Sequence, residues 1–155
     1  RELYSDAGSP DLFRRWLKAI LDSPRRREIG EGYSNSPLRW CIGLLTYRYC
    51  YLFHDSTKHL FDGSVTDTAA LTAADRLHNL VICMIRTERL EEGIVEMLKR
   101  SGHNLPPSLA HEMGSMERTN PSSRKKDYRF YYDDVTAELV GRKDSLVVSR
   151  YGYSF

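Results

Sequence analysis

The sequence of 155 residues has few cysteines and no long hydrophobic run. Its three cysteines, Cys41, Cys50 and Cys83, form no C-x-x-C pair, which argues against a disulfide framework and a zinc site. No apolar stretch approaches the roughly 20 residues that a membrane-spanning helix needs, and the first residues show no signal-peptide pattern. We therefore expect no membrane span and a reducing, cytoplasmic setting, in which Cys83 is a buried thiol.

Neither sign of charge predominates. The chain has 23 Lys and Arg and 21 Asp and Glu, which gives a net charge of +2. This value is too small to predict nucleic-acid binding. Any anion site must come from local clustering, as in the basic runs 25–27 and 124–126. The hydrophobic content of 41% and the length predict one globular domain over residues 1–155.

Helical periodicity and helix-start signals recur along the chain. Ser9-Pro10-Asp11 supplies a capping hydroxyl, a proline at the first helical position and an acid near the positive end of the helix dipole. Gly102 follows another periodic stretch, where a glycine commonly ends a helix. The predicted helices cover residues 10–22, 37–54, 72–79, 87–100 and 127–142, with a shorter one at 107–113.

Residues 80–85, Leu-Val-Ile-Cys-Met-Ile, are six apolar residues without alternation. Such a run predicts a strand buried on both faces, and with the flanking helices it predicts an α/β fold. One strand is too few for a complete α/β domain. Its partner strands are therefore expected to come from residues outside this chain.

A first chemical pattern is His54-Asp55 with Asp75, which stands in Ala-Asp-Arg-Leu-His-Asn. It resembles the HD superfamily of metal phosphohydrolases, in which histidines and aspartates on helices hold a divalent metal that activates water. No histidine precedes His54, and the gap to Asp75 is shorter than in those hydrolases. The plainer interpretation is a His-Asp pair at a helix end.

A second pattern covers more of the chain. An apolar segment leads into Thr87-Glu88-Arg89-Leu90, and a stretch rich in Asn, Ser, Arg and Lys covers 120–126. Tyr131-Tyr132-Asp133 comes next, and the given sequence closes on Tyr-Gly-Tyr-Ser-Phe at 151–155. This ordered series resembles the C-terminal part of sulfotransferases that use 3′-phosphoadenosine 5′-phosphosulfate (PAPS). The resemblance implies a mostly helical C-terminal portion of a P-loop-type sulfotransferase fold, with the buried strand near 80–85.

One part of the sulfotransferase pattern is missing. That family holds the 5′-phosphosulfate in a glycine-rich loop with Lys and Ser/Thr, and this chain has no such unit, since Lys18 and Lys58 lack the glycines. The resemblance therefore implies a partial domain without its N-terminal nucleotide-binding part. We expect such a chain by itself to bind PAPS poorly and to catalyse little.

The resemblance also implies a function and a site. The function is transfer of a sulfuryl group from the co-substrate PAPS to a hydroxyl of a small-molecule or carbohydrate acceptor. The 3′-phosphate of PAPS would be held by a group of hydroxyl and cationic side chains. These candidate residues are Ser122, Ser123, Arg124, Lys125 and Lys126.

Two alternatives and one open role remain. The basic run can equally be a solvated loop, and the whole chain can be a non-catalytic, α-rich interaction module. Sulfuryl transfer needs a base to accept the proton of the acceptor hydroxyl. His54, Asp55 and His59 are the mid-chain candidates, and the sequence assigns the role to none of them.

Overall fold

The computed structural model describes residues 5–22, 32–115 and 126–154, except for the side chain of residue 110. They form two compact units. The large unit comprises the described parts of 1–80 and 123–155, and the small unit those of 81–122. The described chain is mostly helical, and its β-pairing is limited to an isolated antiparallel bridge between His54 and Asn79.

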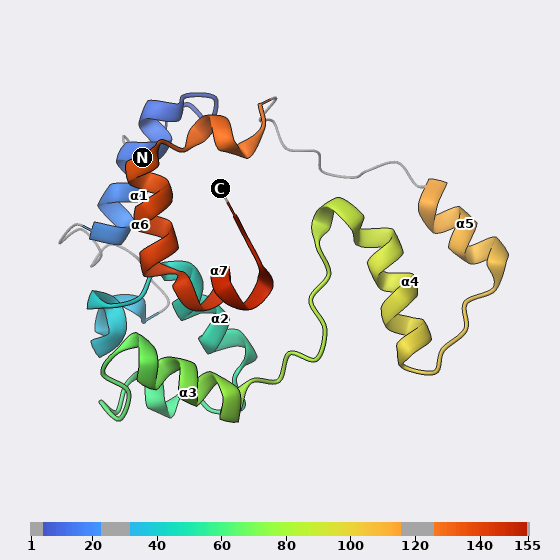
Figure 1. The fold of residues 1–155 in the computed structure, drawn as a ribbon, viewed down its shortest axis with the longest axis horizontal. Helices are drawn as coiled ribbons and strands as arrows, with labels where there is room; N and C mark the ends of the chain where they lie inside the picture. The colour runs from blue at the N-terminus through green and yellow to red at the C-terminus, as the bar shows by residue number, and fades with distance from the viewer. Residues whose placement is uncertain (1–4, 23–31, 116–125, 155) are drawn as a thin grey trace. The chain divides into compact units, whose positions relative to one another are not determined.

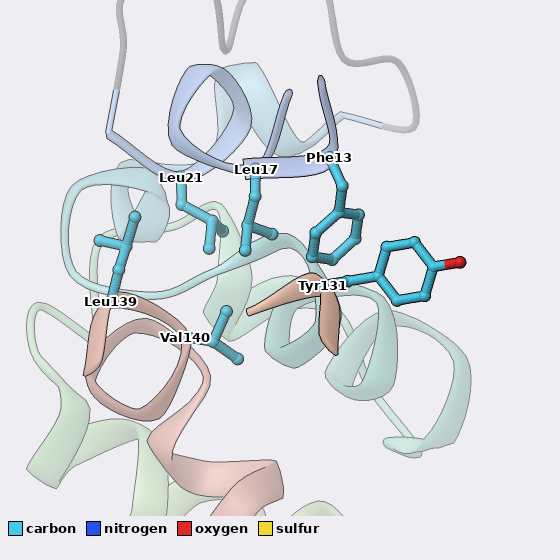
Figure 2. Packing of buried hydrophobic residues seen from close by; sticks show 6 residues of the cluster. All are labelled: Phe13, Leu17, Leu21, Tyr131, Leu139 and Val140. Carbon is cyan, nitrogen blue, oxygen red and sulfur yellow. The ribbon is translucent and has the colours of Figure 1, made fainter. Parts of the chain in front are cut away.

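The predicted helix over 10–22 is confirmed as α1 (Pro10–Asp22). Three apolar side chains spaced four residues apart, Phe13, Leu17 and Leu21, share one buried face of α1. This face packs against α6 (Asp134–Lys143) and η7 (Tyr128–Tyr131). Figure 2 shows the resulting core, in which the α1 side chains meet Tyr131, Leu139 and Val140.

The predicted helix over 127–142 is interrupted after η7. The segment η7 ends at Tyr131, and Asp133 caps α6: its Oδ1 accepts from the backbone N–H of Thr136 at 2.8 Å, and Thr136 Oγ1 accepts from the N–H of Asp133 at 3.0 Å. The Arg14 guanidinium of α1 donates to the carbonyls of Tyr131 and Tyr132, both at 3.1 Å. A further helix, α7 (Ser145–Tyr151), follows where the sequence analysis predicted none.

The predicted helix over 37–54 is also divided, into η4 (Pro37–Trp40) and α2 (Leu44–Phe53). The cause is a close approach at Gly43, whose N–H donates to the carbonyl of Lys143 at 2.6 Å. A Cβ at Gly43 would lie 2.4 Å from the Asp144 carboxylate. That carboxylate is buried and accepts from the N–H of Thr46 at 2.7 Å.

The rest of the large unit contains η3 (Tyr33–Asn35), η5 (Lys58–Leu60) and α3 (Thr68–His78). The helix α3 begins before the predicted 72–79, because Asp67 caps it by accepting from the N–H of Ala70 at 2.8 Å. Figure 1 shows α2 and α7 in this same unit, and the two helices are in contact. A second group of buried apolar side chains fills this region: Tyr33, Leu38, Ile42, Tyr47, Leu60 and Leu71.

The small unit contains η6 (Thr87–Arg89), α4 (Leu90–Arg100) and α5 (Pro107–Ser115). These elements confirm the helices predicted over 87–100 and 107–113, and Gly102 has the expected left-handed φ of 80°. In contrast, the buried strand predicted over 80–85 is wrong. Ile82 is 96% exposed, and Cys83 is exposed rather than buried.

The missing strand has a physical reason. A strand is stable only where its N–H and C=O groups pair with a neighbour, and no described residue forms a ladder with 81–85. Without that strand, the described residues contain no β-layer, and the predicted α/β fold is not seen among them. They form a mostly helical structure. No described helix combines the length and hydrophobicity needed to cross a membrane.

Candidate functional site

The resemblance to sulfotransferases predicts a phosphate site at Ser122, Ser123, Arg124, Lys125 and Lys126. The first four lie outside the described residues, so that their arrangement stays a prediction. Lys126 is exposed, and its Nζ lies 5.8 Å from the centre of the Phe130 ring. This distance places the ammonium within the range of a cation–π contact.

The residues just after this basic run contact the end of the chain. Tyr128 Oη donates to the carbonyl of Ser154 at 3.0 Å, and Tyr151 Oη lies 2.8 Å from Tyr49 Oη of α2. The tail thus contacts helical elements, and Tyr153 remains 47% exposed. The described part of the terminal aromatic motif therefore contacts η7 and α2 of the large unit.

A buried polar cluster is the most developed chemical arrangement in the described chain. We define it as Tyr49, His54, His59, Asp75, Asn79 and Arg150. It is assembled by α2, η5, α3 and α7. His54 follows α2 directly, and the bridge between His54 and Asn79 brings it to the end of α3. His54, His59 and Asp75 are 6%, 7% and 1% exposed, so that their polar atoms depend on each other for hydrogen bonds.

The cluster is a continuous hydrogen-bonded chain. His54 Nε2 lies 3.0 Å from Asp75 Oδ1, and His54 Nδ1 lies 3.0 Å from His59 Nε2. Asn79 Nδ2 donates to Asp75 Oδ1 at 2.7 Å, and Arg150 forms an ion pair with Asp75 Oδ2. Both oxygens of the buried carboxylate are therefore satisfied by donors.

This connectivity fixes the tautomers. An ionised Asp75 only accepts hydrogen bonds, so that Nε2 of His54 must carry the proton that it receives. His54 Nδ1 is then an acceptor, and the proton between the two rings belongs to Nε2 of His59. Nδ1 of a neutral His59 is consequently unprotonated and able to accept a proton.

Burial favours the neutral form of both rings. It lowers the pKa of His54, because the loss of water outweighs the favourable bond to Asp75. Burial also lowers the pKa of His59, and the positive charges that His54 and His78 would carry lower it further. The pKa of Tyr49 is raised by burial and by its bond to Tyr151, which keeps the phenol protonated.

A third imidazole borders the cluster. The His78 ring stacks on the His59 ring at 5.0 Å between centres and 11° between planes. His78 Nδ1 lies 2.8 Å from Asp55 Oδ1, and the two side chains are 35% and 52% exposed. Asp55 therefore contacts the outer histidine and lies apart from the pair of His54 and Asp75.

The HD-type pattern is thus brought together in part. Imidazoles and a carboxylate are suitable ligands for a divalent metal, and His54 contacts Asp75 directly. Their donor atoms, however, are engaged in hydrogen bonds with one another. Among residues 5–22, 32–115 and 126–154, no group of three or more His, Cys, Asp or Glu side chains is arranged to hold a metal ion.

Several members of the cluster were not predicted from the sequence. Asn79 carried a signal, because it stands four residues after Asp75 and therefore on the same helical face. Arg150 and Tyr49 carried none, since they are distant in sequence and reach Asp75 and Asn79 only through the packing of α2 and α7.

Comparison of the chain with protein-family models, with curated proteins and with solved structures finds no match.

Proposed function

We propose that the chain is the C-terminal portion of a PAPS-dependent sulfotransferase-like domain with a P-loop-type fold, and that it acts in the cytoplasm. The domain would transfer a sulfuryl group to a hydroxyl of a small-molecule or carbohydrate acceptor. The contact of Tyr128 with Ser154 carries this proposal, because Tyr128 stands two residues after the basic run and Ser154 belongs to the terminal aromatic motif. It supports a common role for the basic run and the terminal aromatic motif.

The basic run would bind the 3′-phosphate of PAPS. Two serines and three cationic side chains offer hydrogen-bond donors to the doubly charged phosphate. Hydrogen bonds between a charged donor and a charged acceptor are the strongest hydrogen bonds in proteins. Lys126, the described member, has an exposed ammonium that is accessible to such an anion. The terminal tail, held by Tyr128, would border the same site.

The polar cluster would supply the base. As the acceptor oxygen bonds to sulfur, the bond between sulfur and the 5′-phosphate oxygen breaks, and 3′-phosphoadenosine 5′-phosphate leaves. The hydroxyl proton would pass to Nδ1 of His59, which Asp75 and His54 keep unprotonated. Proton-detected nitrogen NMR spectra of the imidazoles test this assignment, and protonation of His59 Nδ1 at neutral pH would exclude it.

Nucleotide binding tests the phosphate assignment. Isothermal titration should show that 3′-phosphoadenosine 5′-phosphate binds more tightly than adenosine 5′-phosphate, which lacks the 3′-phosphate. Substitutions Arg124→Ala and Lys125→Ala should each weaken binding of the first nucleotide by about tenfold, since one charged hydrogen bond contributes on the order of 1.5 kcal/mol.

The matched control is Arg26→Ala, which removes the same charge from the other basic run and should leave both affinities unchanged. Equal affinities for the two nucleotides would contradict the 3′-phosphate site. An effect of Arg26→Ala as large as that of Arg124→Ala would show that the response is only to net charge.

An HD-type metal phosphohydrolase is the second candidate, favoured by the direct pairing of His54 with Asp75. A thermal-melting experiment with manganese, nickel and iron tests it. This function predicts a higher melting temperature that Asp75→Asn abolishes, whereas no shift with any metal would exclude it. If neither the nucleotides nor the metals bind, the non-catalytic interaction module is the remaining interpretation.

A further inference from the structure

A cavity of about 500 Å³ lies between α3 and α7, within the large unit. Two arginines and four hydroxyl-bearing side chains are prominent in its wall. They are Thr68, Thr72 and Arg76 from α3, and Ser145, Ser149 and Arg150 from α7. The volume is within the usual range for small-molecule sites and is larger than a bare oxyanion requires.

The charge of the cavity favours an anion. Asp75 also lines the wall, but its two oxygens already accept from Arg150, from Asn79 and from the His54 ring. Arg76 is exposed and has no ion pair with a described residue. The wall therefore has one positive charge that no acid of the described chain neutralises.

The position of Arg150 adds a second donor group. Its pairing with the buried Asp75 restrains the guanidinium at the cavity wall, and its side chain remains 33% exposed. A guanidinium has five N–H donors, so that one bond to a carboxylate leaves others available. Arg76 and Arg150 can each donate paired N–H hydrogen bonds from a planar guanidinium to the oxygens of a phosphate or sulfate group.

The hydroxyl-bearing residues in the wall indicate the kind of molecule that carries the anionic group. Thr72 Oγ1 donates to the carbonyl of Thr68 at 2.8 Å, which leaves its oxygen as an acceptor at the wall. Serine and threonine hydroxyls both donate and accept, as the hydroxyls of a sugar do. A wall of hydroxyls beside two guanidiniums is therefore complementary to a polyhydroxylated anion.

We propose that this cavity binds a phosphate or sulfate monoester of a sugar-like molecule, with Arg76 and Arg150 on the oxyanion and the hydroxyls of α3 and α7 on the sugar. The cavity wall shares Asp75 and Arg150 with the polar cluster, whereas His59 is not among its lining residues. Arg76 has no role in the proposed function, so that a test at Arg76 stands or fails separately from it.

A titration of the ¹⁵N-labelled chain tests the site. The probes are glucose 6-phosphate, glucose 6-sulfate, glucose and inorganic phosphate. At least one ester should shift the amide signals of α3 and α7, and the ester that binds more tightly identifies the preferred oxyanion. Arg76→Gln should weaken that binding by about tenfold, because it removes a charged donor.

The control is Arg142→Gln, which removes the same charge from an exposed position of α6 outside the cavity and should leave the affinity unchanged. Equal losses in the two variants would overturn the proposal, as would the absence of shifts with both esters. Glucose binding as tightly as the esters would exclude the role of the arginines. Inorganic phosphate binding as tightly would exclude the role of the hydroxyls.

Discussion

The helices α1 and α4 have the same kind of sequence and a different degree of burial. Both carry apolar residues on one face, yet Phe13, Leu17 and Leu21 of α1 are buried, whereas no residue of α4 is. The difference lies in the neighbours. The α1 face packs on η7 and α6, while α4 packs mainly on η6 and the short α5. Periodicity thus predicts a helix, and its partners decide how much it stabilises the fold.

The same contrast extends to acidic side chains. In the large unit, Asp75 is buried and bonded to three other residues. In the small unit, Glu96 pairs with Arg100 on the surface, where the two side chains are 63% and 74% exposed. An exposed pair contributes little, whereas removal of one partner from a buried network leaves the others unsatisfied.

The largest effect is therefore expected from Asp75→Ala, which should lower the free energy of unfolding by about 3 to 5 kcal/mol because it leaves His54 and Arg150 without their acceptor. Urea unfolding followed by tryptophan fluorescence measures it, since Trp16 and Trp40 both lie in the large unit. The matched Glu96→Ala should change this transition by less than about 0.5 kcal/mol. Similar losses in both variants would contradict the contrast.

The next largest difference in stability is expected between substitutions in the apolar faces of α1 and α4. Leu21 is 2% exposed, and Leu21→Ala should destabilise the large unit by about 2 to 5 kcal/mol through the cavity that it leaves. Leu98→Ala in the partly exposed face of α4 should leave the tryptophan-detected midpoint unchanged. A shift of that midpoint by Leu98→Ala would show that α4 stabilises the large unit.

Alanine substitutions at two glycines should change stability in opposite directions. Gly43→Ala should destabilise the large unit by about 1 to 3 kcal/mol, since its Cβ would collide with the Asp144 carboxylate. Gly114→Ala in α5 meets no atom within 4 Å and should stabilise that helix by about 0.5 to 1 kcal/mol. Urea unfolding measures the first and amide hydrogen exchange in α5 the second. Faster exchange in Gly114→Ala would contradict this prediction.

The smallest effect is expected from pH. The pKa values of His54 and His59 in the folded chain lie below the ordinary 6.5. As the pH falls through that value, the unfolded chain therefore binds more protons than the folded chain does. The contribution of these neutral rings is complete above about pH 6.5 and is lost progressively below it. Urea unfolding of the large unit should show this decrease, and His59→Gln should make it shallower. A midpoint that rises on acidification from about pH 7 to pH 6 would contradict the two shifts.

The structure explains why some predictions held and others failed. The stretch 10–22 has a cap, a proline and a regular apolar stripe, and it forms the predicted helix without change. The stretch 37–54 has an equally apolar pattern, but the approach of the Lys143 carbonyl and the Asp144 carboxylate to Gly43 divides it. A contact between residues a hundred positions apart leaves no periodic signal.

The candidate site shows the same limit. His54, His59 and Asp75 are candidates from the sequence because of their residue types, and the structure brings these three together in one hydrogen-bonded chain. It separates Asp55 from them and adds Arg150 from the far end of the sequence. Residue type marks what a side chain can do, but its neighbours decide its tautomer and charge.

The sequence by itself determined the helices over 10–22, 87–100 and 107–113 and their amphipathic faces, because these depend on residues within a few positions of each other. Tertiary structure alone decided which apolar faces are buried, that residues 81–85 do not form a strand, and which donors satisfy Asp75. These outcomes depend on long-range contacts, and a partner atom distant in sequence stabilises a strand or a buried charge only once the chain has folded around it.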